Sequence, residues 1–324
     1  MAQQFRFFAA VMVSLCAAIG FARAESITVT HWGAAFYGAP YAVAMEKGWF
    51  KTAKFDVTGI ITSTGGGTSV RNTLASDTPI GEVALPAAIE AIRSGMKLKI
   101  IYSGVGTVAE QVWATRPGQP FKSIKDLKGK KVGYTRPASV SNMVLLMAFE
   151  DAGMKPADVE LVSVGGTGAL LAAVLQGSID AGIIAEPLWT REKEKLQAVF
   201  WVKDVMSPLM TQTVGITTDE YMAKRPDALQ AVVEGRRKGV QFIYQNPAAA
   251  AEIVAKLHKW DLEVTKTVFA QLVRYRYWDE GGFNLNGMNA MLRGLRIVGQ
   301  LQGEVDWNQL IDERFLPAEL RLKK

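Results

Sequence analysis

The sequence predicts an α/β fold made of two lobes, and three observations point to it. Short strand-like runs alternate with helical segments of about ten residues, a pattern typical of βαβ units and a largely parallel sheet. The alternation runs from residue 26 to about 104 and restarts after 121. A stretch at 63–88 is echoed at 163–188, so each lobe carries a unit of glycine turn, helix, strand and proline.

The first lobe begins with a strand at 26–32, where apolar and polar side chains alternate. A Gly- and Pro-rich loop leads to a helix at 40–50, in which Gly48 is a stop signal. The remaining elements of this lobe are a strand at 55–62, a helix at 66–76, a strand at 81–86, a helix at 87–95 and a strand at 97–104.

The second lobe repeats this pattern. Its elements are a helix at 123–130, a strand at 131–135, a helix at 138–153, a strand at 158–164, a helix at 167–177, a strand at 181–185 and a helix at 187–196. We expect the chain to cross between the lobes near 112–118 and to return near 208–214, at the start of a strand at 209–218.

The rest of the chain is helical in pattern and is expected to pack on the first lobe. Its predicted helices are 224–247, 248–258, 262–273 and 284–300. The predicted division is therefore 25–113 and 213–324 for lobe 1, and 114–212 for lobe 2.

The first 24 residues have the layout of a secretory signal peptide. Arg6 precedes an apolar run at 7–21, and Ala22 and Ala24 supply small residues at the −3 and −1 positions of a cleavage site after Ala24. The run is short for a membrane span, although an uncleaved anchor is the alternative. The single cysteine, Cys16, lies in this leader, so the exported chain relies on its core and not on disulfides.

Charge and motifs exclude several classes of function. Without the leader's two arginines, 35 Lys and Arg face 31 Asp and Glu, and the net charge falls from +6 to +4, too small an excess to imply nucleic acid. The two histidines, His31 and His258, share no metal-site motif. The run at 104–109 matches part of the glycine motif of dinucleotide-binding proteins. A strand-like run follows it directly and leaves no room for the helix that would bind the pyrophosphate. No catalytic residue, metal or cofactor is predicted.

The remaining features indicate ligand recognition at the carboxyl ends of the strands, where open α/β sheets bind ligands. Exposed N–H groups at helix N-termini suit an oxyanion, Arg136 offers a charge-assisted contact, and aromatic rings cover an apolar body. The predicted ligand-binding residues are Trp32, Phe36, Tyr37, Gly65, Gly66, Gly67, Thr68, Pro86, Arg136, Ser139, Ser141, Gly166, Glu186, Trp189 and Thr213. The alternatives are that Ser139 is only a helix cap, that Arg136 faces solvent and that the aromatic residues belong to the core.

Asp180 and Glu186 flank a short apolar run and raise the question of paired acid and base catalysis. The strand between them spans about 16 Å, which is too far for such a pair. We expect Asp180 to serve a turn at the far end of the sheet and Glu186 to lie near the ligand.

Several motifs resemble the solute-binding proteins of bacterial ABC importers for nitrate, sulfonates and taurine, a superfamily that includes the thiamin-pyrimidine-precursor proteins. The resemblance covers about 26–245 and is carried by "GAPYAVAMEKGWF", "GEVALPAAIEAIRSG", "SIKDLKGKKVGYTRPAS" and "LVSVGGTGALLAAVLQGSIDAGIIAEPLW". It implies a type-2 periplasmic binding fold, with two lobes around a cleft, two hinge crossings and hinge closure on the ligand. It also implies a cleft lined by 32–37, 65–68, 136–141 and 186–189.

The resemblance implies a function as well. The expected function is a monomeric periplasmic component that captures a small organic anion and delivers it to an inner-membrane ABC permease with a cytoplasmic ATPase. The anion is expected to be a sulfonate or a carboxylate, with or without an aromatic portion. The cysteine-rich iron motif of the pyrimidine-synthesising members is absent, which argues against their chemistry. An exported enzyme and a ligand-presenting sensor are the alternatives, and the arginine and proline of "TRPAS" depart from the small polar run of many relatives.

Overall fold

The computed structural model describes residues 23–52 and 55–322. The predicted signal peptide lies outside the described residues except for Arg23 and Ala24, which open the first strand and pair with Phe55 and Asp56. Among the described helices, none combines the length and the apolar character needed to cross a membrane.

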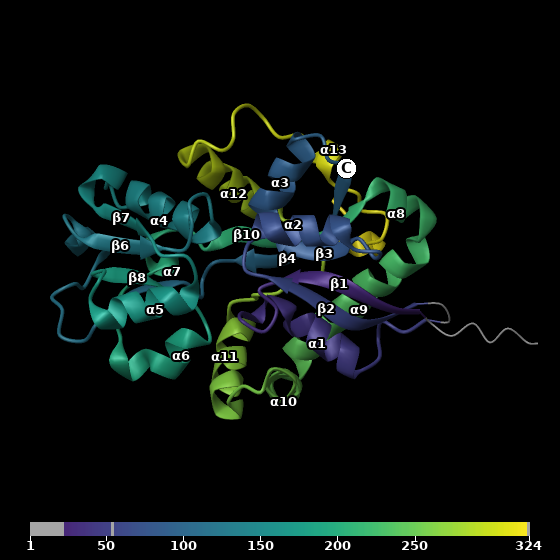
Figure 1. Ribbon diagram of the computed structural model, residues 1–324, viewed down its shortest axis with the longest axis horizontal. Coiled ribbons are helices and arrows are strands. Elements are labelled where there is room, and N and C mark those ends of the chain that lie inside the picture. Colours follow the sequence, from purple (N-terminus) through teal and green to yellow (C-terminus); the bar gives the residue numbers. More distant parts are fainter. Residues whose placement is uncertain (1–22, 53–54, 323–324) are drawn as a thin grey trace, which may run out of the picture.

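In the part of the chain that the structure describes, ten strands form two five-stranded sheets, one in each lobe (Figure 1). The sheet of lobe 1 has the order β2-β1-β3-β10-β4, and that of lobe 2 has the order β7-β6-β8-β5-β9. The strands of lobe 1 are β1 (Arg23–Thr30), β2 (Phe55–Ser63), β3 (Ile80–Ala84), β4 (Leu98–Thr107) and β10 (Leu209–Thr218). Those of lobe 2 are β5 (Val112–Thr115), β6 (Lys131–Tyr134), β7 (Glu160–Ser163), β8 (Ala181–Ile184) and β9 (Gln197–Trp201).

Helices cover both faces of each sheet (Figure 1). In lobe 1 they are α1 (Ala39–Glu46), α2 (Gly66–Ala75), α3 (Leu85–Arg93), α8 (Asp219–Lys224), α9 (Pro226–Gln245), α10 (Pro247–His258), α11 (Leu262–Arg274), α12 (Leu285–Ile297) and α13 (Trp307–Leu310). In lobe 2 they are α4 (Val140–Asp151), α5 (Thr167–Gln176), α6 (Leu188–Glu192) and α7 (Val202–Val205). Short 3-10 turns lie at Phe36–Gly38, Ile124–Leu127, Pro156–Asp158, Lys193–Lys195 and Ala318–Leu320.

Each sheet contains one internal strand, the fourth in its order, that follows a crossing from the other lobe. β10 runs antiparallel between β3 and β4, and β5 runs antiparallel between β8 and β9. The other neighbours, such as β1 with β2 and β6 with β8, are parallel. The two connections between the lobes therefore lead into internal strands of the sheets.

The crossing segments follow from this strand membership. They are 108–111, between β4 and β5, and 206–208, between α7 and β10. The predicted boundaries at 113/114 and 212/213 fall a few residues later, inside β5 and β10, because both strands already pair in the sheet that they enter.

The internal echo corresponds to two equivalent structural units. α2, β3 and α3 in lobe 1 have the same order as α5, β8 and α6 in lobe 2, and both α2 and α5 are ten residues long. Both helices start at a glycine, Gly65 or Gly166, without a side-chain cap. The repeated sequence therefore places the same kind of helix start at the same edge of each sheet.

Several elements differ from the sequence-based expectation, among them the short helices α7, α8 and α13, which were not predicted, and the helix predicted at 187–196, which is α6 followed by a 3-10 turn. The helix predicted at 123–130 is a 3-10 turn, because Asp126 binds the backbone N–H groups of Lys122 and Ser123 and Gly129 turns the chain with a φ of 72°. β9 was not predicted. α12 packs on β10 as expected of a C-terminal helix on lobe 1, but it also packs on α4 of lobe 2.

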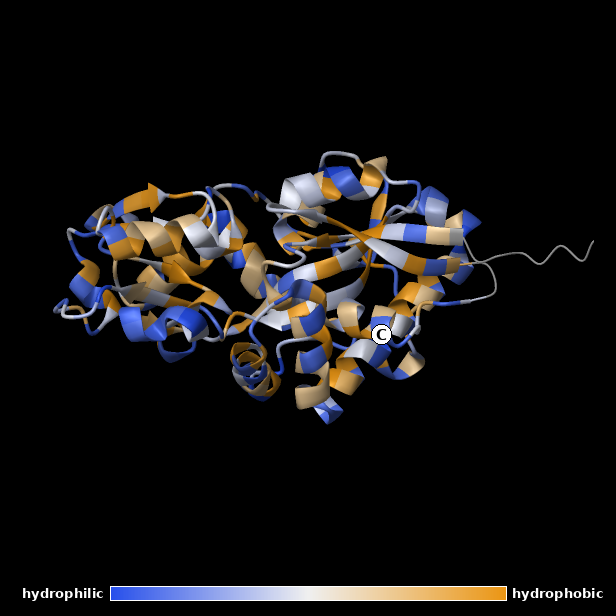
Figure 2. Cartoon of the chain, turned by 60° about the horizontal axis from the view of Figure 1, so that its bottom comes forward, coloured by the Kyte–Doolittle hydropathy of each residue, from blue (hydrophilic) through white to orange (hydrophobic). Residues whose placement is uncertain are grey.

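The core is apolar and reaches into both lobes, with hydrophobic residues concentrated on the inner sides of the sheets and helices (Figure 2). In lobe 2 Trp113 is fully buried, stacks on Phe200 with ring centroids 5.2 Å apart and donates to the Gly133 carbonyl. A second apolar cluster joins the 3-10 turn at Phe36 to α1, α9, α10 and α11. These cores fix the loops that face the other lobe.

Candidate functional site

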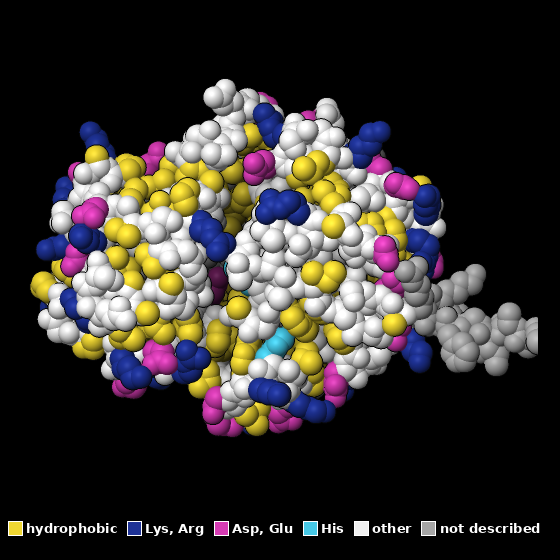
Figure 3. Space-filling model, in the orientation of Figure 1, with side chains coloured by type: hydrophobic (Ala, Val, Ile, Leu, Met, Phe, Trp, Pro, Cys, Tyr) yellow, Lys and Arg dark blue, Asp and Glu magenta, His cyan; other side chains and the backbone are white. Residues whose placement is uncertain are grey.

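A cavity of about 860 Å³ lies between the lobes, and the space-filling view shows the molecule hollowed there (Figure 3). Lobe 1 contributes the loop after β1, the start of α2, the start of α3 and β10, and lobe 2 contributes the starts of α4, α5 and the segment after β8. All these segments follow the carboxyl ends of parallel strands except β10, as the doubly wound α/β arrangement requires.

Besides the start of α3, whose second position is Pro86, the N-termini of α2, α4 and α5 line this cavity. None of them carries an acidic side chain in its first turn. Helix N-termini present unpaired N–H groups and a partial positive charge, so three of them around one cavity create an environment that favours an anion.

Close packing of α2 against the start of α3 explains why glycine occurs at the start of α2. A Cβ on Gly66 would lie 2.9 Å from the Cβ of Ala87 and 3.0 Å from that of Ala84, so a side chain would push α2 away from the start of α3. Without side chains the backbone N–H groups of Gly65 and Gly66 stay open to the cavity.

The start of α4 has a network of hydroxyl groups. Ser139 is the N-cap residue, and its Oγ accepts from the Asn142 N–H and from Thr135 Oγ1, the latter at 2.9 Å. Ser141 Oγ accepts from the Thr135 N–H at 3.0 Å. Both serines line the cavity, so the same residues cap the helix and border the space where a ligand would lie.

Arg136 connects the two lobes at the rim of the cavity. Its side chain is exposed, and Nη1 donates to the Thr64 carbonyl of lobe 1 at 2.6 Å. Arg136 also lines the cavity, so its positive charge lies beside the space between the lobes.

A polar cluster lies at the first crossing segment and the adjoining part of β10, and only its Tyr37 was predicted as part of the site. It contains Glu110 and Gln111 from the first crossing, Gln212 from β10 and Tyr37 from the loop after β1. Tyr37 OH donates to Gln212 Oε1 at 2.9 Å, and Gln212 Nε2 donates to Glu110 Oε1 at 2.9 Å. The cluster joins the first crossing and β10 to the cavity wall.

Burial determines the acid chemistry of the cavity. Desolvation, with a smaller contribution from the charge of Glu186, raises the pKa of Glu110 to about 7 against the opposing effect of the Gln212 hydrogen bond. Desolvation also raises the pKa of Glu186. Burial lowers the pKa of His31, which lines the cavity as well, and the nearby charge of Arg136 acts in the same direction.

Comparisons with known proteins define the family. A family model described as NMT1/THI5 like matches residues 35–250, which is more than half of the chain. The chain belongs to the NMT1/THI5-like family. A relative from Brucella abortus (strain 2308), named only as a binding protein, is 27% identical over 266 residues and is covered over 79% of both chains.

Solved structures share the architecture of this family member. The alkanesulfonate-binding protein of Xanthomonas axonopodis pv. citri, bound to MOPS, superposes with a TM-score of 0.71 at 13% identity and covers 89% of this chain and 98% of its own. The periplasmic aliphatic sulphonate-binding protein of Escherichia coli gives a TM-score of 0.70 at 19% identity, with 90% and 92% covered. The predicted resemblance and the predicted two-lobed periplasmic binding fold are therefore confirmed.

Most of the predicted site residues of this NMT1/THI5-like protein line the cavity. They are Phe36, Tyr37, Gly65, Gly66, Gly67, Thr68, Pro86, Arg136, Ser139, Ser141, Gly166, Glu186 and Thr213. Trp32 and Trp189 do not line it. Trp32 packs against Gly38 and meets His258 edge-on with ring centroids 4.7 Å apart, and Trp189 meets Trp201 edge-on at 5.3 Å.

Several cavity residues have structural partners that limit their freedom. Phe36 is buried, packs on Trp260 and Phe269, and accepts a hydrogen bond at its carbonyl from Trp278 Nε1. Glu186 accepts from the N–H and hydroxyl of Thr190, at 3.1 and 2.9 Å. Asp180, by contrast, does not line the cavity and accepts from the Lys131 N–H at 2.8 Å, the turn role that was expected for it.

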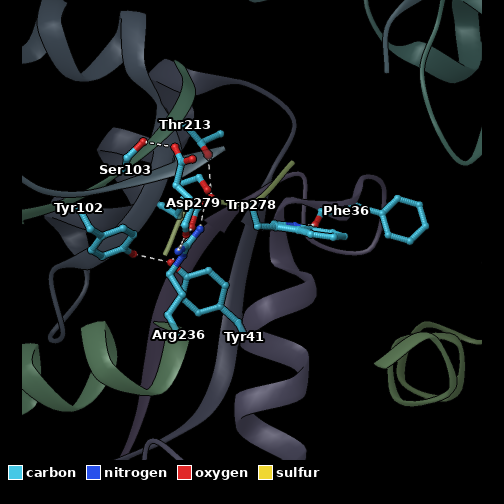
Figure 4. Close-up of polar contacts among 10 residues, drawn as sticks. Phe36, Tyr41, Tyr102, Ser103, Thr213, Arg236, Trp278 and Asp279 are labelled. Carbon is cyan, nitrogen blue, oxygen red and sulfur yellow. Dashed lines mark hydrogen bonds and ion pairs between the residues drawn. The ribbon is translucent and has the colours of Figure 1, made fainter. Parts of the chain in front are cut away.

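Behind the cavity wall lies a buried ion pair between Glu82 of β3 and Arg236 of α9 (Figure 4). Arg236 Nε donates to Glu82 Oε2 at 2.8 Å, and its other nitrogens donate to the carbonyls of Asp279 and Gly104. Thr213, which lines the cavity, donates to Glu82 Oε1 at 2.7 Å. The ion pair therefore supports the cavity wall from behind.

Sequence reasoning missed Glu110, Gln111, Gln212 and Tyr277 as cavity residues. Tyr277 stacks on Tyr37 with an interplanar angle of 6° and ring centroids 6.2 Å apart. A signal for two of them was present, because the adjacent polar residues Glu110 and Gln111 interrupt an otherwise apolar run where the chain changes lobes. Among the described residues, no group of three or more metal-binding side chains is assembled.

Proposed function

We propose that this chain is the substrate-binding component of an ABC importer and that it captures a small organic anion, a sulfonate or carboxylate, between its lobes. The observation that carries the proposal is the convergence of the N-termini of α2, α4 and α5, without acidic first turns, on one cavity between the lobes. The bound anion would then pass to an inner-membrane permease with a cytoplasmic ATPase.

The size and lining of the cavity support an organic ligand rather than a bare inorganic ion. A cavity of about 860 Å³ lies within the range of roughly 300–1,000 Å³ that holds small organic molecules. Tyr37 and Tyr277 offer aromatic surface for an apolar portion, while the glycine starts of α2 and α5, Arg136 and the Ser139–Ser141 turn face the anionic group. The names of the sulfonate-binding structural neighbours agree with this ligand class.

Closure of the lobes is the proposed mechanism of capture. A ligand that contacts both lobes favours the closed arrangement by the contacts that only this arrangement provides. The segments 108–111 and 206–208 would act as the hinge, and the division into lobe 1 and lobe 2 predicted from the sequence would correspond to the two moving bodies.

Export to the periplasm belongs to the same proposal. Cleavage after Ala24 would release a chain that begins inside β1, with Glu25 as its first residue. Mass spectrometry of the protein purified from a periplasmic extract would give the mass of the chain starting at Glu25, and a native gel-filtration mass would test the expected monomer.

The central test is a ligand screen by thermal shift and calorimetry with alkane sulfonates, aromatic sulfonates, aromatic carboxylates and their uncharged amide analogues. We expect at least one anion to bind with one-to-one stoichiometry and its amide analogue to bind more weakly. Binding of amides but not anions would contradict the proposal, and turnover of a bound compound without any partner would favour an exported enzyme instead.

A further inference from the structure

Two oxygen atoms in the cavity wall have no hydrogen-bond donor among the described residues. They are Glu110 Oε2 and Gln111 Oε1. Both side chains line the cavity at the first crossing segment, and each is only 4% exposed. Buried acceptors are nearly always paired in folded proteins, so two adjacent unpaired ones at a ligand cavity call for an explanation.

The surrounding polar groups do not supply the missing donors. Gln212 Nε2 donates to Glu110 Oε1 and to the Thr107 carbonyl, and Tyr37 OH donates to Gln212 Oε1. Gln111 Nε2 also donates to Gln212 Oε1, at 3.3 Å. Exchanging the amide atoms of Gln111 would set its oxygen against the Gln212 oxygen, so the orientation with Gln111 Oε1 unpaired is the favourable one.

The positive charges of the cavity are also directed elsewhere. Three arginines line it: Arg136 Nη1 donates to the Thr64 carbonyl, Arg71 to Thr68 Oγ1 and Arg93 to the carbonyl of Gln302. The hydrogen bonds of these arginines go to other residues and not to Glu110. The acceptor pair therefore has no cationic partner among these arginines, and a buried carboxyl group without one favours a cation supplied from outside.

We infer that the ligand carries an amino group in addition to its anionic group, and that Glu110 and Gln111 bind this amino group at the hinge end of the cavity. The inference rests on the proposed function, because it describes the opposite end of the same ligand. An ammonium group can donate to both free oxygens and balance the carboxylate charge of Glu110. The ligand is then an amino-bearing organic anion, with its negative group at the helix N-termini and its nitrogen at the crossing.

The test uses two matched pairs of probes that differ only in the amino group. They are 4-(aminomethyl)benzoate with 4-methylbenzoate, and 4-(aminomethyl)benzenesulfonate with 4-methylbenzenesulfonate. Calorimetry on the wild-type protein should give at least about tenfold tighter binding for the amino member of a pair, the size expected of a charge-assisted hydrogen bond.

Variants then assign the effect to the acceptor pair. E110Q should reduce the advantage of the amino probe to less than about threefold while the methyl probe keeps its affinity. E90Q is the matched control, because Glu90 also lines the cavity but is exposed, and its loss removes the same charge without touching the crossing segment. Thermal unfolding shows whether each variant is folded. The comparison of the amino and methyl probes on the wild-type protein does not depend on any variant.

The outcomes separate the two proposals. Equal binding of both members of each pair, or an amino advantage that E110Q keeps, would overturn the role of Glu110 and Gln111 and leave anion capture intact. Failure of all four probes in a protein that binds other anions would also overturn it. Failure of every anion in the wider screen would overturn the proposed function itself.

Discussion

Glu110 is a carboxyl group in a buried position, and its chemistry depends on what the cavity holds. Burial raises its pKa to about 7, so that without a ligand the group is partly protonated near neutral pH. Its Oε1 is bound by Gln212 and its Oε2 is unpaired. A single side chain thus links the hinge, the cavity and the protonation state of the protein.

The first prediction concerns the pH dependence of stability. Because the pKa of Glu110 is higher in the folded protein than its ordinary value of 4.5, the folded state holds the proton more tightly. The free energy of unfolding therefore falls as pH rises from about 4.5 to about 7, by an amount on the order of 3 kcal/mol, and then levels. Urea unfolding between pH 4.5 and 8 should show this slope in the wild type and a flatter one in E110Q. A slope unchanged in E110Q would contradict the assignment, since Asp279, whose pKa burial raises to about 6, would then account for it.

A second prediction concerns the buried ion pair. Arg236 is 1% exposed and Glu82 is fully buried, so R236M would leave a buried carboxylate without its partner and lower the free energy of unfolding by about 3–5 kcal/mol. The double variant E82Q/R236M should lose less than R236M alone. The control is R293A, which breaks ion pairs to Glu150 and Asp151 at a partly exposed site and should cost less than about 1 kcal/mol. Equal losses for the two arginines in urea unfolding would contradict this ranking.

The residues of the site differ in whether the neighbouring sequence alone could predict their place in the cavity. The glycine turns, Arg136 and Ser139 could be predicted because each follows a strand, and the carboxyl ends of parallel strands meet at one edge of a sheet. Trp32 could not be placed, because its contact with His258 comes from α10, more than two hundred residues away in sequence. The donors around Glu110 were equally hidden, since Gln212 reaches it only through the insertion of β10 into the sheet.

At the level of elements, the helix starts determine what the cavity can bind and α12 determines how the lobes meet. α12 packs on β10 of lobe 1 and on α4 of lobe 2, and Arg293 on α12 binds Glu150 and Asp151 at the end of α4. The strands and long helices could be predicted from alternation and periodicity. β9 could not, because a five-residue edge strand gives no period that separates it from the end of the preceding helix.

A third prediction tests the contact between α12 and α4. A Cβ on Gly294 would lie 2.8 Å from the Cβ of Met143, so G294A should lower the free energy of unfolding by about 1–2 kcal/mol although alanine favours helices. The control is G168A in α5, where a Cβ would meet nothing within 4 Å and the same exchange should be neutral or stabilising. If G294A were as stable as G168A relative to the wild type in thermal unfolding, the packing of α12 on α4 would not be tight.

At the scale of the whole molecule, the contacts between the two lobes determine how far the lobes can separate. Two crossings at 108–111 and 206–208, the α12–α4 contact and the Arg136–Thr64 hydrogen bond connect them. Opening of the lobes must break the hydrogen bond between Arg136 and Thr64, and it must also separate α11 from α6, which contact each other across the two lobes. The two-lobed arrangement itself could be predicted from the repeated unit at 63–88 and 163–188.

The fourth prediction concerns Arg136. R136A removes the hydrogen bond between the lobes, which weakens every ligand, and it removes a positive charge beside the cavity, which weakens anions further. We expect a loss of about tenfold or more for an anion found in the screen and a smaller loss for its uncharged amide analogue, measured by calorimetry. Equal losses would show that Arg136 only joins the lobes, and R71A, at another lining arginine without a contact between lobes, is the control.

The strand order also has a consequence for the order in which the two lobes can fold. All five strands of lobe 2 lie within 112–201, so that lobe is one continuous stretch of chain, whereas the sheet of lobe 1 lacks its fourth strand until 209–218 has been delivered. A chain that folds from its N-terminus onward can therefore complete lobe 2 while β4 still has no neighbour to join it to β3. We expect lobe 1 to be finished last, because β10 completes its sheet and helices α8 to α13 follow β10 in the chain. The cavity, which needs both lobes, is then the last part of the protein to exist.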